Sequence, residues 1–217
     1  MFFRGIKNTT SIDIAANDGD TLKNTEDTMK RLFLLILLGI MTFSLCGAEL
    51  TSWIYFGPAY TSISGDYVDN RGFVGDLMGL QIGFSFISQF ENNLFWGANY
   101  HFVQRGWKLD DSYYVYNIEN SYFDGILKCG YAQNLKNLAF YPYVGAGLSA
   151  LLDSNTFPSG YLNTDFPVVT GIDISLTPNF MAGFHYSFGT QNIIDDGWGS
   201  ARMNTWNISL GYILPKN

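Results

Sequence analysis

The sequence predicts an all-β fold, a closed antiparallel up-and-down transmembrane β-barrel of about eight strands. Apolar and polar residues alternate with a period of two along segments of roughly ten residues, the pattern of barrel strands with one face in lipid. The 217 residues are 17% aromatic and only 14% charged, whereas roughly a quarter of residues are charged in an ordinary soluble domain. After the N-terminal region, no apolar run is long enough for a transmembrane helix.

The alternation is clearest in residues 122–152, which we interpret as two strands joined by a polar turn at residues 132–137. On the first strand, Leu127 lies on one face while Asp124 and Lys128 lie on the other. On the second strand, apolar side chains alternate with Gly and Ser. A face that gathers small and charged residues suits the interior of a barrel in lipid.

Three parts follow one another along the chain. Residues 29–48 have a basic start, a short apolar run and small residues up to Ala48, as in a secretory signal peptide. Residues 1–28 are polar without apolar periodicity. We interpret them as an upstream extension without folded structure, translation beginning at Met29. Residues 49–217 form the barrel domain. It has 7 Lys and Arg against 14 Asp and Glu, a net charge of −7, so nucleic acid is not expected as a partner.

Six further segments supply the remaining strands, in chain order residues 52–61, 77–89, 94–107, 166–176, 180–189 and 203–214. The first segment is apolar on both faces, so its orientation stays open. An even number of strands closes the sheet and leaves no open edge, which lipid requires because unpaired backbone groups find no water there.

The connections between these strands are alternately long and short. Residues 62–76, 108–120, 153–165 and 190–202 are long and polar, and the other connections are tight. In outer-membrane barrels, long loops face outside and short turns face the periplasm. Both ends of the barrel domain are therefore expected in the periplasm. Five tryptophans near strand ends are candidate anchors at the membrane interfaces, Trp53, Trp96, Trp107, Trp198 and Trp206.

The central hairpin resembles a known family. Its first strand ends in Lys128-x-x-Tyr131, and its second carries Pro142-Tyr-x-Gly-x-Gly147. In this order and spacing, residues 82–214 are similar to the small outer-membrane barrels that include PorT-like proteins, of OmpX/OmpA type. The resemblance implies an eight-stranded outer-membrane barrel of a Gram-negative cell envelope and little about activity.

The inward faces are the place for chemistry within the membrane. Nine polar residues are expected to form a network in the lumen: Gln81, Asn99, His101, Arg105, Asp124, Lys128, Asp173, His185 and Ser187. Side chains fill the interior of an eight-stranded barrel. We expect a plug in which Arg105 and Lys128 offset the two aspartates, because unpaired buried charges are costly. An open channel is the alternative.

His185-Tyr-Ser187 suggests a second possibility. Residues two apart share a face, and His-x-Ser resembles the active-site strand of outer-membrane lipid A deacylases, in which His activates Ser for attack on an ester. Those enzymes keep the pair on the lipid-facing surface, whereas parity places His185 and Ser187 inside. We therefore predict no catalytic, cofactor or metal site.

The sequence favours a non-enzymatic outer-membrane barrel whose external loops interact with partners, in envelope integrity, adhesion or a secretion assembly. The expected partners are outer-membrane lipid, lipopolysaccharide and envelope proteins that bind the loops. A narrow porin for small solutes and the hydrolase remain alternatives. A soluble lipocalin-like barrel would require the two faces of every strand to be reversed.

Overall fold

The computed structural model describes residues 49–66, 73–110, 115–135, 138–154, 164–192, 194–196 and 199–215. The predicted upstream extension (residues 1–28), the predicted signal peptide (residues 29–48) and Trp198 lie outside the described residues. Within those residues, no helix is long and apolar enough to cross a membrane.

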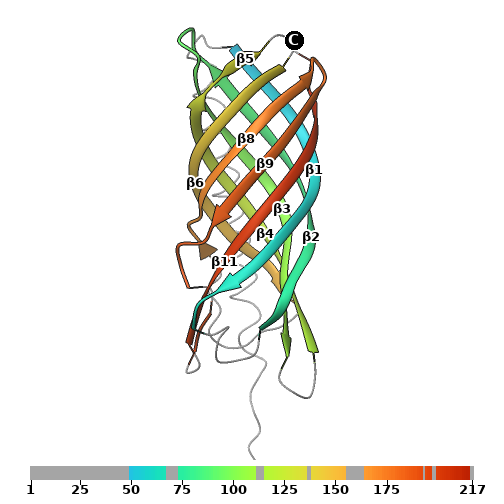
Figure 1. Cartoon of the computed structure of the whole chain (residues 1–217), viewed down its shortest axis with the longest axis vertical. Coiled ribbons are helices and arrows are strands. Elements are labelled where there is room, and N and C mark those ends of the chain that lie inside the picture. The colour runs from blue at the N-terminus through green and yellow to red at the C-terminus, as the bar shows by residue number, and fades with distance from the viewer. Residues whose placement is uncertain are drawn as a thin grey trace, which may run out of the picture. The chain divides into compact units, whose positions relative to one another are not determined.

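The described part of the chain forms a closed barrel of eight long antiparallel strands (Figure 1). Each long strand pairs with the next one along the chain, and the first pairs with the last, from Trp53↔Ile213 to Ser64↔Arg202. The predicted fold class and strand number are therefore confirmed. The strands are β1 (Glu49–Ser64), β2 (Phe73–Gln89), β3 (Leu94–Asp110), β4 (Val115–Tyr131), β6 (Leu138–Ser154), β8 (Val168–Thr177), β9 (Phe180–Phe188) and β11 (Gly199–Ile213).

Three short strands extend this sheet at its ends. β5 (Gln133–Leu135) and β7 (Thr164–Asp165) both pair with β6, and β10 (Ile194–Asp196) pairs with β11. The predicted turn at residues 132–137 therefore contains the short strand β5, and the predicted strand at residues 166–176 begins two residues later, at Val168.

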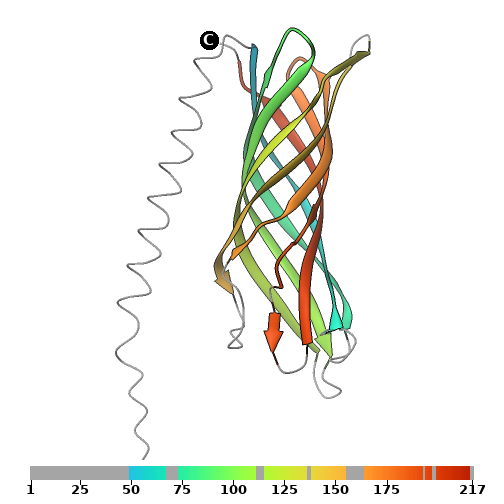
Figure 2. The ribbon, with the colours of Figure 1, turned by 90° about the vertical axis from the view of Figure 1, so that its left-hand side faces the viewer.

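The two ends of the barrel differ, and we name them the turn end and the loop end. At the turn end, short connections join β2 to β3, β5 to β6 and β8 to β9 (Figure 2). The β8–β9 turn is held by Thr177, whose Oγ1 accepts the backbone N–H groups of Asn179 and Phe180 at 3.2 and 3.1 Å. Glu49 pairs with Gln89 beside the β2–β3 turn, so the barrel domain begins at the turn end. β11 also ends there (Figure 1).

Strands continue into the segments that were predicted as long loops. β3 runs to Asp110 and β4 begins at Val115, so most of the predicted connection at residues 108–120 is paired backbone. The prediction of a loop there was wrong because polar side chains are tolerated on strands that leave the lipid. The β3–β4 hairpin projects at the loop end in both ribbon views (Figures 1 and 2).

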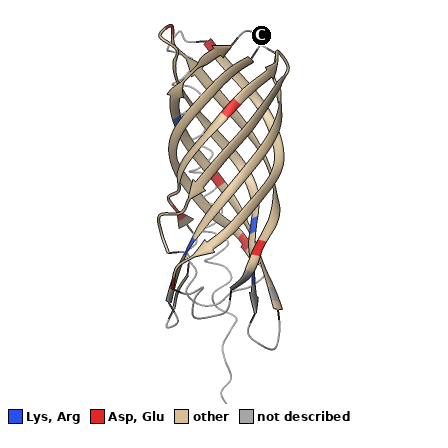
Figure 3. Cartoon of the chain, in the orientation of Figure 1, with Lys and Arg blue, Asp and Glu red and all other residues tan. Residues whose placement is uncertain are grey.

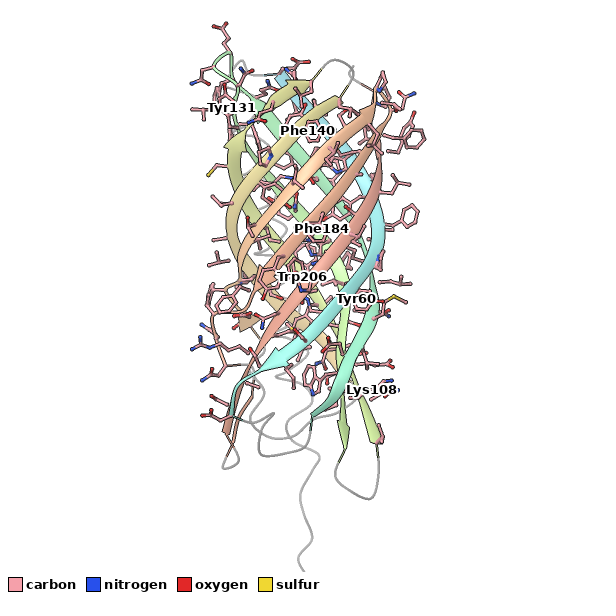
Figure 4. All side chains as sticks on the ribbon, in the orientation of Figure 1. Tyr60, Lys108, Tyr131, Phe140, Phe184 and Trp206 are labelled. Carbon is pink, nitrogen blue, oxygen red and sulfur yellow. The ribbon has the colours of Figure 1, made fainter. Side chains whose placement is uncertain are left out.

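Side chains alternate between lumen and exterior along every long strand. On β1, whose orientation the sequence left open, Trp53 and Tyr55 are buried while Ile54 and Phe56 are 50% and 64% exposed. A soluble lipocalin-like barrel would have a polar exterior, whereas the exterior positions here are apolar, so that alternative is wrong. We call the apolar exterior surface the belt. Aromatic side chains occur near its two margins, Tyr131 and Phe140 towards the turn end and Tyr60 and Trp206 towards the loop end (Figure 4).

The lumen contains two apolar clusters with polar residues between them. The turn-end cluster is built from Trp53, Tyr55, Ile87, Phe95, Ile126, Ala132, Tyr141, Tyr143, Val169 and Met181. The loop-end cluster is built from Ala59, Ile63, Val103, Trp107, Ile118, Tyr122, Ala201 and Met203. On β3, Asn99 and His101 lie between Phe95 of one cluster and Val103 of the other. The interior is therefore a packed core with a polar layer.

Candidate functional site

The nine polar residues predicted to face the lumen are all buried inside the barrel. They come from β2, β3, β4, β8 and β9, and none is more than 4% exposed: Gln81, Asn99, His101, Arg105, Asp124, Lys128, Asp173, His185 and Ser187. Most of the barrel ribbon carries neither sign of charge (Figure 3). Each buried charge therefore needs a partner within the lumen, because desolvating an unpaired charge is costly.

Asp124 is the centre of the first cluster. The strand register places His101, Asp124 and Ser149 side by side across β3, β4 and β6. Ser149 Oγ donates to Asp124 Oδ1 at 2.6 Å, and Arg105 Nη1 donates to Ser149 Oγ at 2.8 Å. Arg105 also reaches both carboxylate oxygens, with Nη1 3.3 Å from Oδ1 and Nη2 against Oδ2. A two-point arginine–carboxylate pair of this kind fixes geometry as well as charge.

Two histidines adjoin this carboxylate. His101 Nε2 lies 3.0 Å from Asp124 Oδ2 without the alignment of a hydrogen bond, so the contact is one of proximity. On the other side of the ring, His101 Nδ1 and the Tyr55 hydroxyl form a hydrogen bond of 2.9 Å. The ring centroid of His185 is 5.9 Å from that of His101. The first cluster thus joins β1, β3, β4 and β6, with β9 beside it.

Lys128 is the centre of the second cluster. Its Nζ donates to Asp173 Oδ2 at 2.6 Å and to Ser85 Oγ at 3.1 Å. The ammonium also lies 4.8 Å from the ring centroids of both Trp53 and Tyr143, within the range of cation–π attraction. Ser85 Oγ in turn donates a hydrogen bond of 2.6 Å to the side-chain carbonyl oxygen of Asn99. Lys128 is therefore held by one carboxylate, one hydroxyl and two aromatic faces.

The remaining predicted residues take less specific positions. Gln81 Nε2 donates to the backbone carbonyl of Ile208 at 3.2 Å. His185 Nε2 has no hydrogen-bond partner among the described residues. Both His185 and Ser187 are buried in the lumen, at 1% and 4% exposure. A lipid ester at the belt does not reach them, so the geometry gives no support to a deacylase that uses this pair.

Two of the tryptophans predicted as interface anchors lie inside the barrel. Trp53 belongs to the turn-end cluster and packs against Lys128, and Trp107 belongs to the loop-end cluster. The prediction was wrong for both because each lies at an inward position of its strand. Trp206, by contrast, is 46% exposed on the exterior, where its ring contacts those of Tyr186 and Phe184.

Three hydrogen-bonding residues of the two clusters were missing from the predicted network. Ser85 and Ser149 have the inward parity that the alternation assigns to them, but a serine alone gives no signal of a charge partner. Tyr55 was missed because the first strand is apolar on both faces. Register, which decides that Asp124 lies between His101 and Ser149, is a property of paired strands and not of one segment.

The buried carboxylates of the two lumenal clusters are paired with cationic side chains. Among the described residues, no three His, Cys, Asp or Glu side chains come together in an arrangement that could hold an ion. The carboxylates of Asp124 and Asp173 are instead engaged by Arg105 and Lys128. The chemistry of the site is thus charge compensation and packing.

The closed sheet, the apolar belt and the charge-paired core define a small transmembrane β-barrel. No family model matches the chain, and no curated protein matches its sequence. Among solved structures it is similar to Ail, the attachment invasion locus protein of Yersinia pestis, in complex with the heparin analogue sucrose octasulfate. The identity is 19% over 76% of this chain and 99% of that chain, with a TM-score of 0.44.

Two further solved structures are similar. Neisserial surface protein A is 14% identical over 76% of this chain and 98% of that one, with a TM-score of 0.46. The outer membrane protein OprG from Pseudomonas aeruginosa is 13% identical over 78% of this chain and 98% of that one, with a TM-score of 0.46.

Proposed function

We propose that this protein is a non-enzymatic outer-membrane barrel that acts as a closed scaffold, and that its connections at the loop end make the functional contacts. The observation that carries this proposal is the state of the lumen. Arg105 and Lys128 are each paired with a buried carboxylate, and apolar clusters lie on both sides of the polar layer. A packed and charge-compensated core suits a scaffold better than a wet path for solutes.

The proposed location is the outer membrane of a Gram-negative envelope, with both ends of the barrel domain in the periplasm. The supports are the apolar belt and the asymmetry of the connections, because long loops lie outside in barrels of this kind. The signal peptide proposed at residues 29–48 would deliver the chain there. Outer-membrane lipid, lipopolysaccharide and envelope proteins are the proposed partners. The proposed role is in envelope integrity, adhesion or a secretion assembly.

Membrane fractionation combined with gel mobility tests the location and the closed fold. We expect a chain begun at Met29 to fractionate with the outer membrane and to migrate differently before and after boiling. An epitope inserted between β6 and β7 is expected to bind antibody on intact cells, and one after β11 only on permeabilised cells. Recovery of a soluble periplasmic protein, or the opposite pattern of epitope exposure, would refute the location or the orientation respectively.

Conductance in planar bilayers tests the scaffold against the narrow porin. We expect no discrete conductance steps from the purified barrel, because the Arg105–Asp124 and Lys128–Asp173 pairs lie across its interior. The positive control is the same preparation with a known porin added. Regular steps from the pure protein, lost on boiling, would favour the porin.

A further inference from the structure

A groove in the belt lies where β2 runs beside β3. Its apolar part has a volume of about 500 Å³, within the range of small-molecule sites, which is roughly 300–1,000 Å³. The walls carry the exterior side chains of Phe56, Leu80, Ile82 and Phe102, each between 55% and 64% exposed. These walls are therefore not covered by any described part of the chain.

An irregularity in strand pairing accounts for the groove. Between the pairs Asp76↔Trp107 and Gln81↔Val103, β2 has four residues and β3 has three. An extra residue in one strand bends it and re-aims the neighbouring side chains. Gly79 lies within the extra segment, and a Cβ there would be only 1.9 Å from the carbonyl oxygen of Gln104. The groove is thus built into the backbone and does not depend on one rotamer.

A polar hollow of about 320 Å³ continues the groove towards the loop end. The two hollows share Gln104 and Ser121, which are paired across β3 and β4, and Ser121 is paired with Asp153 on β6. Towards the loop end, the residues on the outward face of β3 are, in order, Phe102, Gln104, Gly106 and Lys108. Lys108 lies beyond the belt margin marked by Tyr60 (Figure 4).

Along β3, an apolar part is followed by hydrogen-bonding side chains and then by a positive charge. One lipid lying along the strand has its parts in the same order. Within the belt the surroundings are lipid, so an acyl chain is the natural occupant of the apolar part. The polar hollow presents an amide at Gln104, a hydroxyl at Ser121 and two carboxylates, at Glu119 and Asp153. These groups are hydrogen-bonding partners for sugar hydroxyl groups. The ammonium of Lys108, further out, is a point charge that suits a phosphate.

We propose that the groove between β2 and β4 binds a phosphorylated glycolipid of the lipopolysaccharide type. Its acyl chain lies between Leu80 and Phe102, its sugar lies at Gln104 and Ser121, and its phosphate lies at Lys108. The assignment rests on the proposed orientation, in which the loop end faces the outer leaflet. It deepens the proposed function by giving the lipid partner a defined place on the scaffold.

The test compares lipid retained by variants purified from outer membranes in mild detergent. Native mass spectrometry counts the bound lipid, and sugar analysis identifies it. In Leu80→Trp the indole fills the apolar part. The matched control is Val144→Trp, at an exterior position that is 60% exposed and outside the groove. We expect Leu80→Trp to retain roughly tenfold less glycolipid than the control. Lys108→Gln should lower glycolipid retention while leaving glycerophospholipid unchanged.

Equal retention by Leu80→Trp and Val144→Trp would overturn the proposal, as would a bound lipid that is a glycerophospholipid in every variant. Heat-modifiable migration shows for each variant that the barrel is folded. If the unmodified protein is absent from the outer membrane, the proposed function fails. If it is present there but carries no glycolipid, only this inference fails.

Discussion

The interior and the exterior of this barrel wall follow different rules although they alternate residue by residue. Inside, Asp124 has partners on both neighbouring strands, β3 and β6, and Lys128 is held by a carboxylate, a hydroxyl and two rings. Outside, Leu127 is 63% exposed between them and needs only to be apolar. The exterior therefore specifies that the chain enters lipid, and the interior specifies which register the strands adopt once there.

The first prediction removes the carboxylate at the centre of the interior. In Asp124→Ala the Arg105 guanidinium stays buried without its partner, and breaking a buried pair in this way costs about 3–5 kcal/mol. The free energy of unfolding, measured by urea titration in lipid vesicles, should fall by that amount. Leu127→Ala, on the exterior of the same strand, is the control and should cost much less. Equal losses in the two variants would mean that the interior is no more specific than the belt.

The second prediction places a charge in the belt. Leu210 lies on the exterior of β11, paired with Phe56 and Ala182. Leu210→Arg should cost about 2–4 kcal/mol, because an arginine near the bilayer midplane is poorly solvated. Ser62→Arg, beyond Tyr60 on the outward face of β1, should cost only about 0–1 kcal/mol. A similar cost at both positions would contradict the assignment of the belt.

These two surfaces also show how much of the structure the sequence could predict. Alternation placed Asp124, Lys128 and Asp173 inside, because a period of two assigns a face to each residue without knowledge of the neighbouring strand. It did not identify Ser149 as the residue that links Arg105 to Asp124. That contact depends on the pairing of β4 with β6.

The misassigned tryptophans have a physical reason. The expected polar plug occupies the middle of this lumen, and apolar clusters lie on both sides of it. Trp53 and Trp107 lie near strand ends, where a lipid anchor and a core residue have the same composition. The predicted limits of the strands at residues 108–120 were wrong for a comparable reason. Polar residues are compatible both with a loop and with strands that extend beyond lipid.

The third prediction asks whether the second interior pair can be replaced by apolar packing. Lys128→Met leaves the Asp173 carboxylate buried without its cation, and Asp173→Leu does the reverse. The double variant removes both charges, and apolar replacement of a buried pair is often neutral or stabilising. A double-mutant cycle should give a coupling energy of about 0.5–3 kcal/mol. Additive losses would show that Lys128 is held by its aromatic neighbours and not by Asp173.

The last prediction concerns Asp165, a buried residue at the loop end of the barrel. Its Oδ1 accepts backbone N–H groups from Phe166, Thr190 and Gln191 at 2.8, 3.1 and 3.0 Å, and so links β7 to the chain after β9. Asp165→Asn keeps an acceptor but loses the charge that strengthens these bonds, at a cost of about 1 kcal/mol.

Because this link lies at the rim, the loss should appear mainly as local opening. Limited proteolysis after β9 should speed up several-fold in Asp165→Asn while the global unfolding midpoint changes little. The control is Asp153→Asn, since Asp153 is exposed and accepts one N–H, from Ser154 at 3.0 Å. Unchanged proteolysis in Asp165→Asn would show that strand pairing alone holds the rim. Faster proteolysis together with a lowered midpoint would place Asp165 in the same cooperative unit as the Asp124 and Lys128 clusters.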